Sequence, residues 1–155
     1  MPIARPALGF TLLELLVVLA IAGFMMAVVP PLISAALPGV ETQAAARQLA
    51  AGLRFARGQA VYGGAPVALT IDLDNLRFSV PGQDHPVSLP SRVKLHLTTV
   101  YSERLDDHQG AIRFFPDGSS TGGRVRVSQG RSGYDVDVAW LTGRVEVRPV
   151  SLGSG

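Results

Sequence analysis

The chain has 155 residues, 47% of them hydrophobic, and contains no cysteine, so neither a disulfide framework nor thiolate chemistry is available to it. Its fourteen Lys and Arg against twelve Asp and Glu give a net charge of only +2, which is not by charge alone the signature of a nucleic-acid-binding protein. Once a short first segment and one apolar run are set aside, about 120 residues are left, enough for one compact domain and too few for two.

The first element along the chain is an apolar run of membrane length, residues 9 to 33, which carries one carboxylate, Glu14, near its start. As a helix, residues 10 to 29 span about 30 Å, which is the thickness of a bilayer hydrocarbon core. We therefore predict a transmembrane helix over residues 10–33. A carboxylate inside a membrane helix costs up to about 3.5 kcal/mol, so Glu14 is a candidate functional residue that needs a partner; the alternative is a plain anchor that tolerates it.

The start of this run points to proteolytic processing. It begins too early and is too long for a cleaved secretory signal, whose apolar core has about 7 to 15 residues. Residues 9–14, Gly-Phe-Thr-Leu-Leu-Glu, resemble the processing site of type IV pilins and type II secretion pseudopilins. The resemblance implies that a prepilin peptidase removes residues 1–9 by cutting between Gly9 and Phe10, that Phe10 is then N-methylated, and that the apolar helix is kept.

Processing also supplies Glu14 with a partner. The new amine of Phe10 is the one positive group at the membrane depth of Glu14, and opposite charges attract far more strongly at low dielectric than in water. The pair can form within one helix or, if subunits stack with a stagger, between Glu14 of one subunit and the amine of its neighbour. We expect Glu14 to act in subunit assembly.

The charges that flank the run give only a weak signal for orientation. The positive-inside rule places the Arg5 end in the cytoplasm, yet Arg47, Arg54 and Arg57 follow on the other side. A leader formed by residues 1–9 is too short to be anything but a tail, and the family resemblance implies a periplasmic domain. We therefore expect a single-pass protein of the bacterial inner membrane with its domain in the periplasm.

Prolines mark the next stretch of the chain. Pro30 and Pro31 lack backbone donors, and Pro38 is followed by Gly39. We expect the helix to kink or be interrupted at the first pair and to loosen or break again at the second, before a second helical stretch.

Residues 34–62 are expected to form a periplasmic amphipathic helix that continues the stalk. Arg47, Arg54 and Arg57 lie largely off its apolar face, and we predict that they face solvent, with a site for an acidic partner as the alternative. The apolar positions recur at intervals of three and four, which is one face of a helix; they are Ala45, Leu49, Leu53, Ala56 and Ala60.

Residues 63–155 change from a helical period to a period of two. Strands with one apolar face need a cover, and residues 42–61 are the only helical candidate. The predicted fold class is therefore α+β, a long amino-terminal helix packed on an antiparallel β-sheet, which the resemblance makes pilin-like. The alternation predicts strands near residues 67–73, 77–80, 93–97, 125–127, 134–138 and 145–147.

Connections between these strands are predicted from their turn residues. Leu141, Thr142 and Gly143 join the last two strands as a short hairpin in which Gly143 can adopt a positive φ. The Pro-rich residues 81–90 are predicted to be a mobile surface loop. Neither family resemblance in this chain rests on residues 81–110, so this part of the domain depends on pattern alone.

Two further strings carry a second resemblance. Residues 114–125, Phe-Phe-Pro-Asp-Gly-Ser-Ser-Thr-Gly-Gly-Arg-Val, and residues 138–145, Val-Ala-Trp-Leu-Thr-Gly-Arg-Val, are similar to the H-type minor pseudopilins of the type II secretion system, a family that also contains FimT-like minor pilins. The loop that bears the motif consists of Gly118, Ser119, Ser120, Thr121, Gly122 and Gly123.

The same loop has glycines at the spacing of a phosphate-binding loop. That motif continues with Lys and Ser or Thr and opens a helix, whereas here Arg124 and Val125 begin a predicted strand. Pro116, Asp117 and Gly118 suit a β-turn, so a tight connection between strands accounts for the sequence and nucleotide binding is rejected.

Catalytic and metal-ligating patterns are weak. His85, His96 and His108 are far apart without metal-ligand spacing, and no nucleophile elbow is present. Asp106 and Asp107 could bind a cation beside His108, but a solvated loop is the simpler interpretation, and a hairpin tip accounts for Asp72 and Asp74. We expect no enzyme activity, no cofactor and no metal.

The resemblance implies a structural protein, a minor pseudopilin that joins other pseudopilins in a fibre whose extension helps to export folded proteins. The implied partners are the other major and minor pseudopilins, the prepilin peptidase and the inner-membrane secretion platform. The alternative is a FimT-like minor pilin that contributes to pilus assembly or contacts DNA during uptake through exposed arginines. The arginines that could contact DNA are Arg124, Arg126, Arg131, Arg144 and Arg148. Their charge is offset by nearby acids, which argues against DNA binding; these acids are Asp135, Asp137 and Glu146.

Overall fold

The computed structural model describes residues 11–99 and 108–153, with the backbone alone for residues 27–38. Its one described helix, α1, runs from Leu12 to Gly63, and the helical assignment continues through Pro30, Pro31 and Pro38. The predicted interruption at the first pair and break at the second are therefore wrong. Each proline removes one backbone donor, and a helix can continue past that loss when its other hydrogen bonds form. The chain nonetheless divides into two compact units between Leu37 and Pro38.

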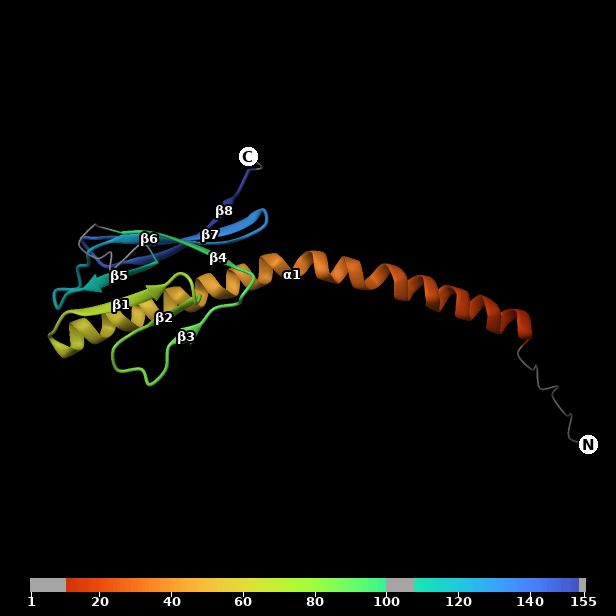
Figure 1. Cartoon of the computed structure of the whole chain (residues 1–155), viewed down its shortest axis with the longest axis horizontal. Coiled ribbons are helices and arrows are strands. Elements are labelled where there is room, and N and C mark those ends of the chain that lie inside the picture. The colour runs from red at the N-terminus through yellow and green to blue at the C-terminus, as the bar shows by residue number, and fades with distance from the viewer. Residues whose placement is uncertain (1–10, 100–107, 154–155) are drawn as a thin grey trace, which may run out of the picture. The chain divides into compact units, whose positions relative to one another are not determined.

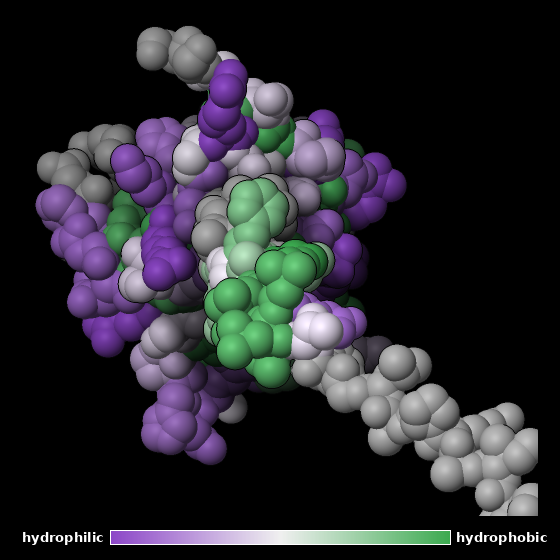
Figure 2. Space-filling view, turned by 90° about the vertical axis from the view of Figure 1, so that its right-hand side faces the viewer, coloured by the Kyte–Doolittle hydropathy of each residue, from purple (hydrophilic) through white to green (hydrophobic). Residues whose placement is uncertain are grey.

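In the first unit, α1 carries large apolar side chains that are exposed to solvent. Figure 2 shows hydrophobic side chains gathered on this part of the helix. Among the described residues, no helix meets the combined length and apolarity expected of a membrane span. The exposed side chains, between about half and four-fifths accessible, are Leu12, Leu13, Leu15, Leu16, Val17, Val18, Leu19, Ile21, Phe24, Met25 and Met26.

The second unit combines the rest of α1 with eight strands in the described chain (Figure 1). All strand pairs are antiparallel. Sheet I has the order β3-β2-β1-β5, and sheet II has the order β4-β6-β7-β8. The strands are β1 (Val67–Asp72), β2 (Arg77–Ser79), β3 (Val87–Ser88), β4 (Lys94–Thr98), β5 (Gln109–Phe114), β6 (Gly123–Gln129), β7 (Ser132–Val138) and β8 (Val145–Ser151).

These strands confirm the α+β fold class and the predicted change of period, but they form two sheets in place of the one predicted. The Pro-rich stretch over residues 81–90 also contains a strand, since β3 pairs with β2 through Phe78 and Val87 and through Arg77 and Ser88. Two residues are too short to show a period of two, so no pattern in the sequence could reveal β3.

The core lies where α1 meets both sheets. The predicted apolar face is confirmed, because Leu49, Leu53, Ala56 and Ala60 are fully buried and Ala45 is nearly so. The small alanines allow the backbone of α1 to approach the sheets closely. The sheets contribute alternate buried residues, namely Leu69, Ile71, Ile112 and Phe114 from sheet I and Val125, Val127 and Val136 from sheet II.

Candidate functional site

Glu14 lies in the first turn of α1. The helix starts after Thr11, whose hydroxyl oxygen Oγ1 accepts a hydrogen bond from the Glu14 backbone N–H at 3.2 Å. A carboxylate in the first turn is also favoured by the partial positive charge of the helix amino terminus. Gly9 and Phe10 lie outside the described residues, so the cleavage site and the pairing of Glu14 with the Phe10 amine stay predictions.

The motif loop begins with the β-turn that the sequence predicts. The backbone N–H of Gly118 donates to the Phe115 carbonyl at 2.9 Å, and Gly118 has a φ of +84°. Asp117 Oδ1 accepts hydrogen bonds from the hydroxyl and the backbone N–H of Ser119, which hold the pKa of the Asp117 carboxyl below its usual value. The loop then leads into strand β6, which fits the rejection of a phosphate-binding loop.

The second half of the motif loop is fastened to the turn between β7 and β8. The backbone N–H of Ser120 donates to the Trp140 carbonyl at 2.7 Å, and its hydroxyl donates to the Ala139 carbonyl at 3.2 Å. The same hydroxyl oxygen accepts the backbone N–H of Gly122 at 3.0 Å. Ser120 is buried, and its bonds to Ala139 and Trp140 join the two motif strings. Both strings carry the family resemblance, but their contact has no local signal in the sequence.

The turn between β7 and β8 is closed by its own hydrogen bonds. The Ala139 carbonyl accepts the N–H of Gly143 at 2.8 Å, and the Ala139 N–H donates to the Arg144 carbonyl at 3.0 Å. Gly143 has a φ of +59°, which confirms the predicted positive φ. We call residues 115–122 and 139–144 together the loop platform.

Two arginines of α1 bond to this end of the domain, Arg57 to the loop platform and Arg54 to Val145, the first residue of β8. Arg57 Nε donates to the Gly118 carbonyl at 3.2 Å, and Arg54 Nη2 donates to the Val145 carbonyl at 3.1 Å. Arg47 is exposed as predicted, whereas Arg57 is half-buried, so the prediction of a solvent-facing arginine row is wrong for Arg57. Helical periodicity shows that Arg57 lies off the apolar face. It cannot show that the Gly118 carbonyl, from a loop distant in the sequence, lies beside it.

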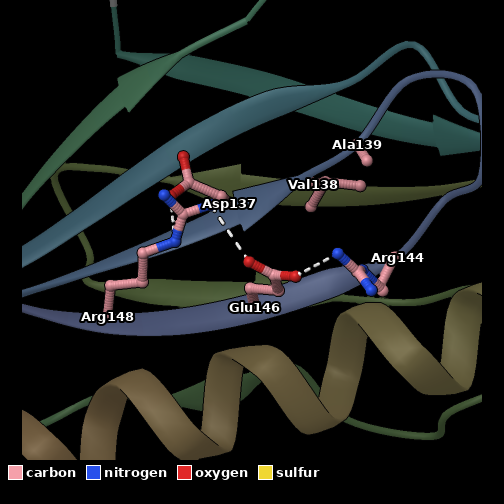
Figure 3. A pocket seen from close by; sticks show the side chains of 6 residues that line it. All are labelled: Asp137, Val138, Ala139, Arg144, Glu146 and Arg148. Carbon is pink, nitrogen blue, oxygen red and sulfur yellow. Dashed lines mark hydrogen bonds and ion pairs between the residues drawn. The ribbon is translucent and has the colours of Figure 1, made fainter.

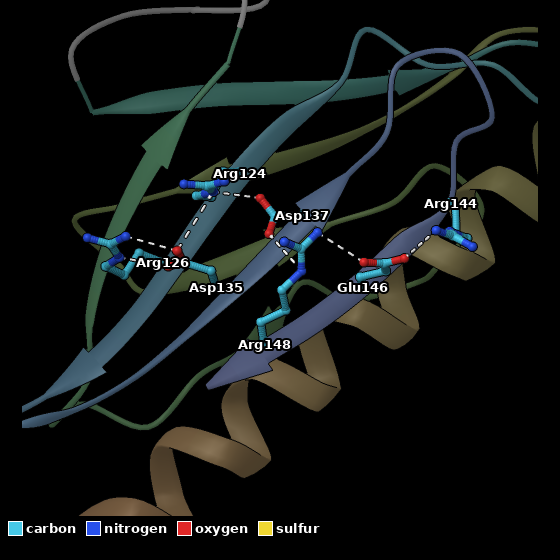
Figure 4. A network of polar contacts seen from close by, with 7 residues as sticks. All are labelled: Arg124, Arg126, Asp135, Asp137, Arg144, Glu146 and Arg148. Atoms are coloured by element: carbon cyan, nitrogen blue, oxygen red, sulfur yellow. Dashed lines mark hydrogen bonds and ion pairs between the residues drawn. The ribbon is translucent and has the colours of Figure 1, made fainter. Parts of the chain in front are cut away.

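Sheet II carries a network of charged side chains on the face opposite its apolar residues (Figure 4). Arg124 pairs with Asp137 at 2.5 Å, and Arg126 pairs with Asp135 at 2.7 Å, as the cross-strand register of β6 and β7 requires. The hydrogen bond that Arg126 donates to Asp135 lowers the pKa of that carboxyl. Donating to Asp137 raises the pKa of Arg124, and donating to Asp135 raises the pKa of Arg126.

The network continues across β8. Arg144 pairs with Glu146 at 2.6 Å, and Arg148 lies 3.0 Å from Glu146 and 3.8 Å from Asp137. Together with Val138 and Ala139, these side chains line a pocket (Figure 3). Asp137 and Glu146 face one another across the strands, and Arg148, which lies close to both, offsets their repulsion. Four of the five arginines considered for DNA contact are therefore ion-paired, as the nearby acids indicated.

The remaining candidate residues form local contacts. Asp72 accepts the backbone N–H of Asn75, the Asn75 side-chain amide and Arg77 Nε, and these bonds, led by the backbone one, lower the pKa of its carboxyl. These contacts confirm the prediction that Asp72 lies at the tip of a hairpin, the one formed by β1 and β2. His108 Nδ1 lies 3.0 Å from Asp74 Oδ1, and the described residues hold no group of three or more potential metal ligands. Asp106 and Asp107 lie outside the described residues.

Comparison with known proteins gives the family. The model of the Type II transport protein GspH family matches residues 45–142, and that of the prokaryotic N-terminal methylation motif matches residues 5–30. Over 150 residues, the chain is 34% identical to the type II secretion system protein H of Xanthomonas campestris pv. campestris, covering 96% of this chain and 88% of that protein.

Solved structures support the fold. The minor pilin FimU of Pseudomonas aeruginosa has a TM-score of 0.54 at 16% identity, over 69% of this chain and 92% of FimU. The minor pseudopilin EpsH from the type 2 secretion system of Vibrio cholerae has a TM-score of 0.53 at 13% identity, over 74% of this chain and 99% of EpsH. The family match covers most of the domain, including the loop platform except residues 143 and 144. The chain therefore belongs to the Type II transport protein GspH family, the minor pseudopilins of type II secretion.

Proposed function

We propose that the chain is made as a precursor, cut between Gly9 and Phe10 by a prepilin peptidase, methylated on Phe10, and anchored in the bacterial inner membrane by residues 10–33, with its domain in the periplasm. It then joins other major and minor pseudopilins at the inner-membrane secretion platform. The observation that carries this proposal is that one chain combines the methylation motif over residues 5–30 with the GspH match over residues 45–142.

The exposed apolar side chains of the first unit support this proposal. A run of large apolar residues on a helix is unfavourable in water and favourable in a bilayer or against other apolar helices. Glu14 lies at the start of this run, where the amine of a processed Phe10 would be on the same or a neighbouring helix. We propose that the pair forms between neighbouring subunits and selects their stagger. In this role Glu14 acts in assembly and not in catalysis.

The domain supports a structural role by its packing and charge. Arginines on sheet II are paired with acids of the same face, which makes the surface poorly suited to phosphate groups. A FimT-like role in DNA uptake would require those pairs to be broken at a cost in stability. A DNA-binding titration at two salt concentrations tests this alternative, because phosphate contacts weaken steeply with ionic strength.

Processing is the step to test first. Replacing Gly9 by a bulky residue, Gly9→Leu, places a side chain where the peptidase must approach the backbone, so the chain should stay uncut. Mass spectrometry of membranes would then find the full precursor, whereas the wild-type chain starts at a methylated Phe10. Leu8→Ala, which changes the preceding residue and leaves Gly9 in place, is the matched control and should be processed. Efficient cleavage of Gly9→Leu with a methylated Phe10 would overturn the proposal.

A further inference from the structure

A hollow of about 400 Å³ lies at the end of sheet II away from the loop platform, where Ser132 of β7 pairs with Ser151 of β8. Its lining residues come from the turn between β6 and β7, from β7 and β8, and from Gly39 of α1, and all belong to the second unit. A Cβ added at Gly39 would lie 3.9 Å from Ser132 Oγ, so this end of the sheet lies beside the first residues of α1 in this unit. We call this hollow the basal pocket.

Hydrogen-bond donors line the basal pocket. Arg131 is exposed in the turn between β6 and β7, and Ser132, Tyr134 and Ser151 each add a hydroxyl. Among the described residues, no other group of the chain forms a hydrogen bond or an ion pair with any of these four side chains. The four donor groups are therefore available to a ligand.

The basal pocket differs from the pocket of Figure 3 in its charge. In that pocket, Arg144 and Arg148 are paired with Glu146, which is itself part of the lining. The described lining of the basal pocket contains Arg131 and no carboxylate, and Glu41, the acid of α1 closest in sequence to Gly39, is not part of it. The basal pocket is therefore positively charged, whereas the other is balanced.

This lining fits a phosphate group attached to a larger molecule. A guanidinium and hydroxyls all donate to phosphate oxygens, and the bonds between arginine and phosphate are strong because both partners are charged. Pro149 and Val150 add an apolar wall. Such a wall suits the carbon chain of a phosphate ester better than it suits a free ion.

The position of the basal pocket along the chain favours a lipid as the source of the phosphate. Gly39 follows the proposed membrane span, residues 10–33, by six residues, and covalent geometry limits six residues to a reach of about 20 Å. As part of α1 they advance only about 9 Å. The headgroup layer beside the hydrocarbon core is about 5 to 8 Å thick. The chain therefore keeps the basal pocket close to the headgroups.

We propose that the basal pocket binds the phosphate headgroup of an anionic phospholipid, with Arg131 as its charged contact. The proposal rests on the proposed function, because it requires residues 10–33 to span the inner membrane. Arginines of sheet II that pair with acids stabilise the domain, whereas the unpaired Arg131 pairs with the lipid. Binding holds this end of the domain against the membrane surface before the subunit is assembled.

The direct test is the reactivity of Arg131 in the full chain, placed in nanodiscs of phosphatidylglycerol or of phosphatidylcholine. Phenylglyoxal modifies accessible arginines, and peptide mass spectrometry gives the rate at each. We expect Arg131 to react about fivefold more slowly in phosphatidylglycerol, since one arginine near an anionic surface contributes about that factor in affinity. Arg47, an exposed arginine outside the pocket, should react equally in both lipids. Equal rates at Arg131 would overturn the proposal.

A further arm separates the lipid from a free anion. Inorganic phosphate is added to the chain in phosphatidylcholine nanodiscs. We expect it to leave the rate at Arg131 nearly unchanged. Protection of Arg131 equal to that in phosphatidylglycerol would show that the pocket takes free phosphate and would overturn the lipid as its ligand.

Substitution gives a second, quantitative test. Native mass spectrometry of the full chain in detergent counts the phosphatidylglycerol that stays bound. Arg131→Ala should reduce this retention about fivefold, and Arg131→Lys should keep part of it. Arg144→Ala removes the same charge beside the other end of β8 and should have no effect. Circular dichroism of each variant checks that the fold is kept.

The outcomes separate this proposal from the proposed function. Retention by Arg131→Ala within about twofold of the wild type would overturn the lipid site and leave the membrane anchor intact, because the anchor does not depend on Arg131. A wild-type chain that is not recovered with membranes would overturn the anchor, and the lipid site with it.

Discussion

The two halves of α1 are both rich in apolar residues but differ in what covers them. In the first half, large side chains such as Leu19 and Phe24 are 62% and 71% exposed, whereas in the second half Leu49 and Leu53 are fully buried. The two sheets cover the apolar face of the second half. Among the described residues, nothing covers the first half, and such an apolar surface is stable in a bilayer or against other apolar helices. The second half of α1 thus contributes to the core of the domain, and we propose that the first half serves association.

The sharpest way to break this comparison is to remove equivalent side chains from each half. Leu53→Ala creates a cavity where α1 meets the sheets and should lower the free energy of unfolding by about 2 to 5 kcal/mol. Leu19→Ala removes the same atoms from an exposed position and should change the free energy of unfolding by less than about 0.5 kcal/mol. Guanidinium unfolding of the full chain in detergent, followed by near-UV circular dichroism, measures both. Equal effects would show that the halves do not differ as described.

A smaller loss of stability is expected when the bond between α1 and the loop platform is removed. Arg57→Ala removes a charged donor from the Gly118 carbonyl and should cost about 1 to 3 kcal/mol of stability. Arg47→Ala, at an exposed position of the same helix, is the matched control and should be neutral. Hydrogen exchange should show faster exchange in residues 115–122 and 139–144 of Arg57→Ala. Unchanged exchange there would mean that the platform is held by its own turns alone.

The pH dependence of stability should show the smallest of these effects. Because Arg126 holds the pKa of Asp135 below its usual value of 3.8, ionised Asp135 stabilises the folded state above that value. This contribution should be lost as the pH falls from about 4 through the lowered folded pKa. Asp135→Asn should therefore be less stable than the wild type at neutral pH, and the difference should shrink in acid.

Unfolding midpoints of the wild type and of Asp135→Asn, followed from neutral pH into strong acid, test this. Asp84→Asn, in an exposed loop position, controls for the loss of a carboxylate. A gap between Asp135→Asn and the wild type that stays constant throughout the acid range would show that the Asp135 charge is not linked to folding.

The sequence predicts those parts of the fold that depend on local periodicity. The face of α1 that meets the sheets and most strands can be predicted because buried positions repeat at 3.6 or 2 residues. The division into two sheets cannot, because it depends on which distant strands pair. β3 is too short to show a period, and β5 is not predicted because its buried residues, Gly110, Ala111 and Ile112, are consecutive. The sequence also does not predict that α1 continues through Pro30 and Pro38. A proline lacks one backbone donor, but the remaining hydrogen bonds of a long helix can still hold it together.

The functional residues divide in the same way. Glu14 and the turn at Gly143 carry their signals in a few adjacent residues, so the sequence is enough to select them. The role of Arg57 and the contact of Ser120 with Trp140 join segments that are distant in the chain. Only the folded domain shows that the two motif strings are one platform.

The central claim is that Glu14 serves association of subunits and is not needed for insertion. Glu14→Val removes a charge from the apolar helix and should leave cleavage and membrane insertion intact, while a neighbouring Phe10 amine loses its partner. Glu14→Asp keeps the charge as the control. The decisive measurement is the amount of each variant in cross-linked pseudopilus fractions relative to the amount in the membrane. We predict a strong loss for Glu14→Val and a smaller loss for Glu14→Asp; incorporation and secretion at the wild-type level with Glu14→Val would contradict the claim.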